Sequence, residues 1–190
     1  KAINDKKDVN LKLNALEAVS YIASSKDYSA AVEPYIVALT ADVLEKAGDK
    51  NIPVRNAATK AVKAIATNIT PRAVKAILPA LLDRTANSNK WTEKIAALEA
   101  ISILVDVARD QIALRMPELI PVLSEAMWDT KPEVKKAATA TITKSTDTID
   151  NKDIIKFIPA LIKCISNPQD VPETVHLLGA TTFVAEVTTA

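Results

Sequence analysis

Short apolar strings recur along the chain at a nearly constant interval. Successive strings start 42, 42 and 38 residues apart, and between them lie pairs of small or apolar residues at 15–16, 57–58, 96–97 and 137–138. A period of this length is typical of a repeat solenoid, in which each unit buries its apolar face only against its neighbours. The four strings are Tyr35–Leu39, Ile77–Leu81, Leu119–Leu123 and Phe157–Leu161, and the last three carry a central proline.

The first helix of each predicted unit has a broad apolar face. It is clearest between Asn89 and Ala108, where Trp91, Ile95 and Leu98 begin a stripe with helical spacing. Such a wide face is expected of a helix that packs on two sides. The helix expected over 132–149 is rich in threonine, a poor helix former, so packing must hold it. Comparable helices are expected over 9–23, 52–69 and 171–187.

Prolines mark the second helix of each unit. A proline in the first turn loses no hydrogen bond, because the N–H groups there have no partner in the helix. A proline further in either kinks the helix or marks its real start. We expect first-turn prolines at Pro34, Pro71 and Pro117, and inner prolines at Pro79, Pro121 and Pro159. Gly48 is expected to end a helix.

The repeat predicts an all-α fold, an α-α superhelix built from about four and a half helix pairs. The period near 40 residues, with Asp49 before Val54-Arg55 and Asp129 before Val134-Lys135, favours the HEAT type of repeat. We expect first helices on one side of the stack and second helices on the other. The whole chain, 1–190, is taken as one HEAT-repeat domain with approximate units 9–47, 51–87, 89–128, 131–166 and a partial 170–190.

Composition limits what such a scaffold can do. Only 2 of 190 residues are glycine, too few for Gly-rich phosphate loops, so we expect no cofactor in this chain. The formal net charge of +1 does not indicate a general affinity for polyanions. No apolar run is long enough to span a membrane, and a cytoplasmic location is expected.

The chain begins at Lys1 without methionine and stops at Ala190 inside a helical pattern, so we expect a piece of a longer protein. Cut ends of a solenoid expose apolar surface. The residues at risk are Val9, Leu13, Leu16, Val184 and Val187.

Residues with catalytic potential are isolated. His176 is the only histidine and Cys164 the only cysteine, so neither belongs to a recognisable metal or nucleophile motif. Glu93, Glu99 and Glu118 are expected on solvent faces rather than as paired catalytic acids. We predict no catalytic, metal or cofactor site.

Basic residues gather near the starts of the first helices. A solenoid brings equivalent positions into rows, so these residues form either ordinary solvated faces or a phosphate-contacting ridge. Trp91 and Trp128 are expected to pack between units, the alternative being an exposed face that meets a partner. The candidate phosphate contacts are Lys50, Arg55, Lys90, Lys94, Lys131 and Lys135.

Several longer strings resemble the amino-terminal HEAT region of the fungal translation elongation factor three family. The resemblance covers nearly the whole chain and is densest after Asn89. The strings are 32–39, 89–95, 115–125, 127–131, 150–153 and 171–188.

The resemblance implies a parent protein that is a ribosome-associated ATPase of the ABC class. Such a parent uses ATP and magnesium in domains outside this chain, and it helps deacylated tRNA leave the exit site. The HEAT arm is then a docking surface for small-subunit RNA and proteins of the ribosome. Two alternatives stay open: a related HEAT scaffold that senses stalled ribosomes and recruits a kinase, or a karyopherin-like carrier.

Overall fold

The computed structural model of the chain describes residues 2–5, 7–25 and 29–147, which belong to the first of two compact units. All regular structure in these ranges is helical, which confirms the predicted all-α fold. The elements are the 3-10 helices η1 (Ala2–Asn4) and η2 (Pro71–Ala73) and the α-helices α1 (Val9–Ser24), α2 (Ser29–Lys46), α3 (Ile52–Asn68), α4 (Val74–Asn87), α5 (Trp91–Val107), α6 (Arg109–Ala113), α7 (Met116–Ala126) and α8 (Pro132–Asp147). The helix predicted over 171–187 lies outside the described residues.

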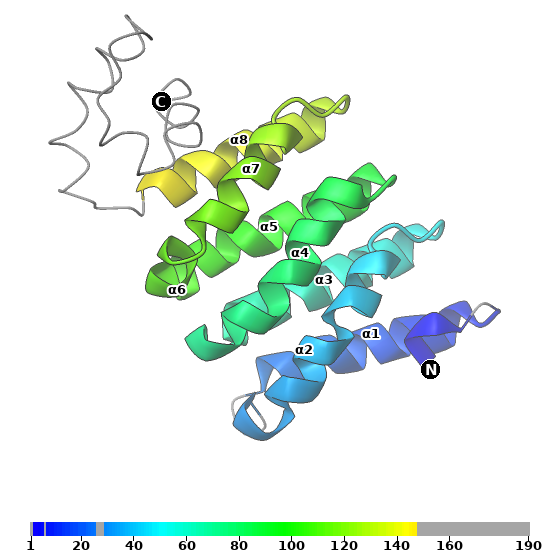
Figure 1. The fold of residues 1–190 in the computed structure, drawn as a ribbon. Coiled ribbons are helices and arrows are strands. Elements are labelled where there is room, and N and C mark those ends of the chain that lie inside the picture. The colour runs from blue at the N-terminus through cyan, green and yellow to red at the C-terminus, as the bar shows by residue number, and fades with distance from the viewer. Residues whose placement is uncertain (1, 6, 26–28, 148–190) are drawn as a thin grey trace, which may run out of the picture. The chain divides into compact units, whose positions relative to one another are not determined.

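The helices of the described unit form two layers (Figure 1). Helices α1, α3, α5 and α8 pack side by side in that order and form the first layer. Helices α2, α4 and α7 lie across them and form the second layer, each contacting its neighbours in both layers. The expected separation of first and second helices is therefore confirmed for this part of the chain.

The recurring residue pairs explain the close packing of the first layer. The second member of each pair, Leu16, Ala58, Ala97 or Ala138, is fully buried. The alanine methyls of α3, α5 and α8 let neighbouring helices approach closely. Larger side chains such as Leu44, Leu78 and Leu119 fill the space between the layers.

The prolines only partly follow the expectation. Pro117 stands in the first turn of α7, as predicted, and Pro71 opens the 3-10 helix η2, which leads directly into α4. The expectation for Pro34 is wrong, because α2 begins at Ser29 and holds Pro34 in its interior. The φ of proline suits a helix and its missing N–H removes only one intrahelical hydrogen bond. Helix α2 can therefore continue through Pro34. Pro79 and Pro121 also lie inside α4 and α7, so they do not mark helix starts.

The first end of the stack is better covered than expected. Leu16 is fully buried and Val9 and Leu13 are partly covered, since α1 packs on α2, α3 and η1. The expectation of a bare Leu16 is therefore wrong. Val184 and Val187 lie outside the described residues. Among the described helices, none is long and apolar enough to cross a membrane.

Candidate nucleic-acid interface

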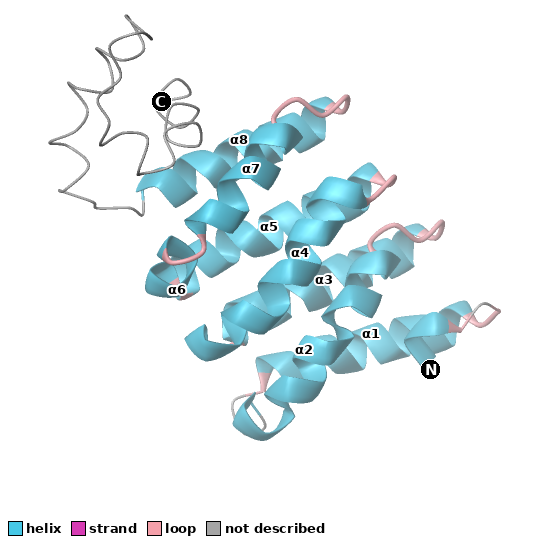
Figure 2. Ribbon diagram, viewed as in Figure 1, coloured by secondary structure: helices cyan, strands magenta, loops and turns pink. Residues whose placement is uncertain are grey.

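The loops that lead from second-layer to first-layer helices lie along one edge of the stack (Figure 2). They join α2 to α3, α4 to α5, and α7 to α8. Since α3, α5 and α8 are neighbours, their first turns stand in a row at this edge. We call these loops and first turns the loop edge. All six predicted basic residues lie on it.

Asp49 organises the first of these loops. Its carboxylate accepts hydrogen bonds from Lys12 Nζ of α1 at 2.7 Å and from the Asn51 N–H at 2.9 Å. The Arg55 guanidinium donates to the Asp49 carbonyl at 3.0 Å. Burial works to raise the pKa of Asp49, but the hydrogen bonds that its carboxylate accepts from Asn51 and Lys12, together with the Lys12 charge, outweigh burial and lower the pKa below its usual value.

Asp129 has the same role two units later. Its carboxylate accepts from Lys94 Nζ of α5 at 2.7 Å and from the Lys131 N–H at 2.9 Å. Burial again acts to raise the pKa of Asp129, and the bonds from Lys94 and Lys131 lower it overall. Each aspartate therefore shapes its own loop and ties it to the preceding first-layer helix.

At the loop between α4 and α5, which lies between the loops of Asp49 and Asp129, the acidic residue is Glu93 in the first turn of α5. The expectation that Glu93 faces solvent is wrong. The residue is 2% exposed. Its carboxylate accepts from Ser88 Oγ at 2.8 Å and pairs with Arg84 at 3.4 Å and Lys90 at 3.3 Å. Because it has three partners, the charge can be buried. Gly48 lies so close that a Cβ there would overlap Glu93 and Lys90.

The six basic candidates therefore differ in how free their charge is. Lys94 is bound to Asp129, and Lys90 is about half exposed but shared with Glu93. Arg55 is held by the backbone carbonyls of Asp49 and Lys50, which carry no net charge. The remaining three, Lys50, Lys131 and Lys135, are exposed and have no acidic partner among the described residues.

The helix starts add to the positive character of the loop edge. The first turn of α3 holds no acidic residue, and that of α5 holds only Glu93, whose charge is paired with Arg84 and Lys90. Lysines beside a helix N-terminus oppose the helix dipole, so they add local positive potential at some cost in stability. The first turn of α8 carries Glu133, which moderates the effect there.

The expectation that the tryptophans pack between units is wrong for Trp128, which is 84% exposed. Trp91 is 43% exposed, so more than half of its surface is covered. The alternative, an exposed aromatic face, therefore describes Trp128. Trp128 lies at the loop edge, between α7 and α8.

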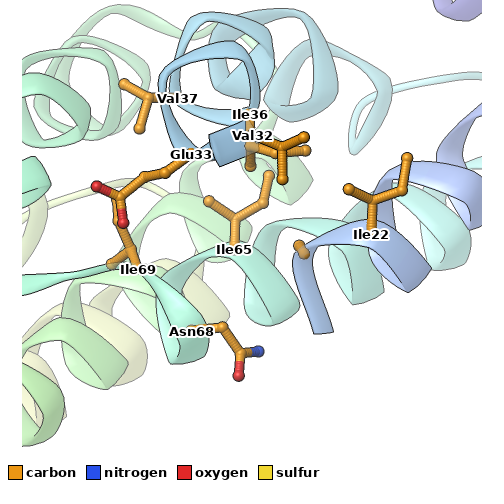
Figure 3. A pocket seen from close by; sticks show the side chains of 9 residues that line it. Ile22, Val32, Glu33, Ile36, Val37, Ile65, Asn68 and Ile69 are labelled. Carbon is orange, nitrogen blue, oxygen red and sulfur yellow. The ribbon is translucent and has the colours of Figure 1, made fainter. Parts of the chain in front are cut away.

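One apolar hollow between the layers is a packing gap. It is lined by Ile22, Val32, Ile36 and Ile65, with Glu33 beside it (Figure 3). Its free space of about 20 Å³ has room for little more than a water molecule. The Glu33 carboxylate instead accepts from the Thr70 N–H and Oγ1, both at 2.8 Å, and so links α2 to the start of η2.

The described residues form no candidate metal site, because no three His, Cys, Asp or Glu side chains among them come close enough to bind one ion. His176 and Cys164 lie outside those ranges.

Comparison with known proteins places the chain in a family. A model described as the EF3 N-terminal HEAT repeat matches residues 1–142. Elongation factor 3 of Candida albicans is 67% identical over 184 residues, 97% of this chain and 18% of the relative. Elongation factor 3B of Saccharomyces cerevisiae is 64% identical over 190 residues, all of this chain and 18% of the relative. The chain thus spans less than a fifth of the length of these relatives.

A solved structure shares the fold at low identity. The crystal structure of a mutant of Kap121p matches with a TM-score of 0.63 and 20% identity, over 90% of this chain and 17% of that one. This likeness concerns the helical repeat fold alone. The family model and the highly identical relatives together show that the chain belongs to the EF3 N-terminal HEAT-repeat family, the amino-terminal region of fungal elongation factor 3.

Proposed function

We propose that this chain is a ribosome-docking arm and that the loop edge contacts the phosphates of small-subunit RNA. The observation that carries the proposal is the set of exposed lysines along one edge: Lys50 stands on the loop before α3, and Lys131 and Lys135 stand on the loop and first turn of α8, two units further along. Successive cations on a preformed scaffold suit a phosphate backbone, whose charges are also regularly spaced.

The wider role follows from the family. Its members are elongation factors, and the resemblance of this chain implies a cytoplasmic parent that hydrolyses ATP and promotes the release of exit-site tRNA. In this proposal the nucleotide, with magnesium, binds domains outside the chain, and the chain itself has a binding role without catalysis. Ribosomal proteins join the RNA as partners. The likeness to Kap121p adds no argument for cargo transport, because it concerns fold alone.

Co-sedimentation with ribosomes over a salt series tests the docking surface. Changing Lys90 or Lys94 would also disturb Glu93 or Asp129, so the sharper variant replaces Lys50, Lys131 and Lys135 with glutamate. We expect the wild-type chain to bind without ATP, with log affinity falling by roughly 0.7 to 0.9 per contact for each unit of log salt. The variant should bind much more weakly and show a smaller salt slope.

The matched control replaces Lys60, Arg72 and Lys75, which are exposed cations away from the loop edge, with glutamate. It changes the net charge by the same amount and should retain most of the binding. Equal pelleting of wild type and the loop-edge variant at every salt concentration would show that these lysines are only a solvated face. Circular dichroism of each variant confirms that it folds.

A further inference from the structure

A hollow beside Trp128 has the chemistry of a side-chain binding site. It is an open hollow between the ends of α4 and α7 and the start of α5 at the loop edge, with a volume of about 460 Å³. Its lining combines the Trp128 indole, apolar contacts from Ala86 and Val122, and the acidic Glu125 and Asp129. This hollow is separate from the exposed lysines of the docking proposal, none of which lines it.

The loop that presents Trp128 is held firmly. The backbone N–H of Trp128 donates to the Glu125 carbonyl at 3.0 Å, and the backbone N–H of Asp129 donates to the Ala126 carbonyl at 3.1 Å. Asp129 is in turn bound to Lys94 at 2.7 Å. An indole that is 84% exposed on a fixed loop does not contribute to the core, but it is ready for a partner because little ordering is needed.

The charge of the lining selects the partner. Lys94 and Asp129 offset each other, and Asp129 is further saturated by the Lys131 N–H. Glu125 is exposed and makes no ion pair or side-chain hydrogen bond with any described residue. The hollow therefore presents one uncompensated carboxylate next to an aromatic face, a combination that favours a cation inside the hollow.

We propose that this hollow binds an arginine side chain from a basic segment of a partner protein. A guanidinium stacks on an indole face and can donate two parallel hydrogen bonds to a carboxylate, which an ammonium cannot do as well. Trp128 supplies the stacking face and Glu125 the carboxylate. The proposal does not depend on RNA contacts at the lysines, so either can fail alone.

Titration with a small peptide tests the hollow directly. Trp91→Phe leaves Trp128 as the only indole, because the chain has 2 tryptophans, and its fluorescence reports on the site. The probe is a blocked Gly-Arg-Gly peptide, with the neutral isostere Gly-citrulline-Gly as its comparison. We expect the arginine peptide to change the emission of Trp128 saturably in the millimolar range, and the citrulline peptide to bind roughly three- to tenfold more weakly.

Two variants assign the contacts. Glu125→Gln in the same background should weaken the arginine peptide by roughly three- to tenfold, whereas Glu17→Gln, an exposed glutamate on α1, should leave it unchanged. Trp128→Ala, followed by NMR shifts of the Thr85 and Ala126 amides, should abolish the response. Glu125 and Trp128 are both exposed, so neither substitution should disturb the fold.

Three results would overturn the proposal. One is an emission of Trp128 that does not respond to the arginine peptide, and another is equal binding of the arginine and citrulline peptides. The third is a stronger response to a uridine oligonucleotide than to the arginine peptide, which would make Trp128 a base-stacking platform.

Discussion

At the scale of single residues, polar contacts between units connect positions about one repeat apart. Lys12 pairs with Asp49 and Lys94 with Asp129, and Glu33 accepts from Thr70 in the same way across units. Ion pairs at a protein surface contribute little, but these aspartates are largely covered and also bind backbone N–H groups. They therefore fix the loops on which the candidate docking residues stand.

Removing both aspartates should weaken the chain at neutral pH and flatten its acid response. Their folded-state pKa values are lowered, so the unfolded chain binds more protons in acid than the folded chain. The stability that they supply is complete above the unfolded value near 4 and is lost as pH falls through the folded values. We expect D49N/D129N to cost roughly 1 to 2 kcal/mol per site at pH 7 and much less at pH 3.

Urea unfolding at pH 7, 5 and 3 measures this difference. Glu45, whose pKa the Lys46 hydrogen bond also lowers, is present in both chains and does not contribute to the comparison. If the stability difference between the two chains stayed constant from pH 7 to pH 3, the aspartates would not be responsible for the acid response.

The site could be predicted from the sequence only in part. The repeat correctly indicated that the basic residues gather on loops and first turns of neighbouring units. It did not reveal that Lys94 is bound to Asp129 or that Glu93 is buried, because each depends on which side chain the tertiary packing brings close. A search for opposite charges about one repeat apart would have found the Lys12–Asp49 and Lys94–Asp129 pairs.

At the scale of helices, apolar periodicity predicted the first-layer elements to within a few residues. The periodicity works because burial on two sides repeats strictly with the helical turn. The sequence was less informative where local rules compete with packing: Pro34 lies inside α2, and the short α6 after α5 was not predicted. Five-residue helices such as α6 are too short to show a period.

Helix α8 offers a clear test of propensity against packing. Thr139 and Thr143 are exposed, and their hydroxyls bond to carbonyls one turn earlier, whereas Thr141 is 2% exposed and its hydroxyl also lies 3.4 Å from the Leu98 carbonyl of α5. We expect T139A/T143A to stabilise the chain by about 1 kcal/mol, because alanine is the better helix former. T141A should instead destabilise it by about 1 kcal/mol, because a buried methyl and its contacts are lost.

Thermal unfolding followed by circular dichroism distinguishes these outcomes. The three sites carry the same residue in one helix, so they serve as controls for each other. A shift in the same direction for both variants would show that burial does not decide the effect.

At the scale of the described unit, packing connects mainly neighbouring helices. Helix α1 packs on α2, α3 and η1, while α5 in the middle packs on α2, α3, α4, α6 and α8. A solenoid built from such contacts has a stability that approximates a sum of unit and interface terms. Its ends can therefore open while the interior stays folded.

Matched substitutions at two fully buried leucines test this independence. Leu16 of α1 and Leu98 of α5 are both 0% exposed, so each change to alanine should cost about 2 to 5 kcal/mol locally. In hydrogen exchange, Leu16→Ala should accelerate α1 and its partners α2 and α3, and leave α8 as protected as in wild type. Leu98→Ala should accelerate α5 together with α3, α4 and α8, because the centre has interfaces on both sides.

The docking proposal adds a functional consequence to this test. Lys131 and Lys135 lie far along the stack from Leu16, whereas Lys50 stands on the loop that Asp49 ties to α1. Ribosome binding by Leu16→Ala should therefore lose only the Lys50 contact, and Leu98→Ala should weaken binding more. If Leu16→Ala accelerated exchange equally in α1 and α8, the unit would unfold as one cooperative body. The fixed spacing of the lysines would then depend on every helix pair rather than on its own neighbours.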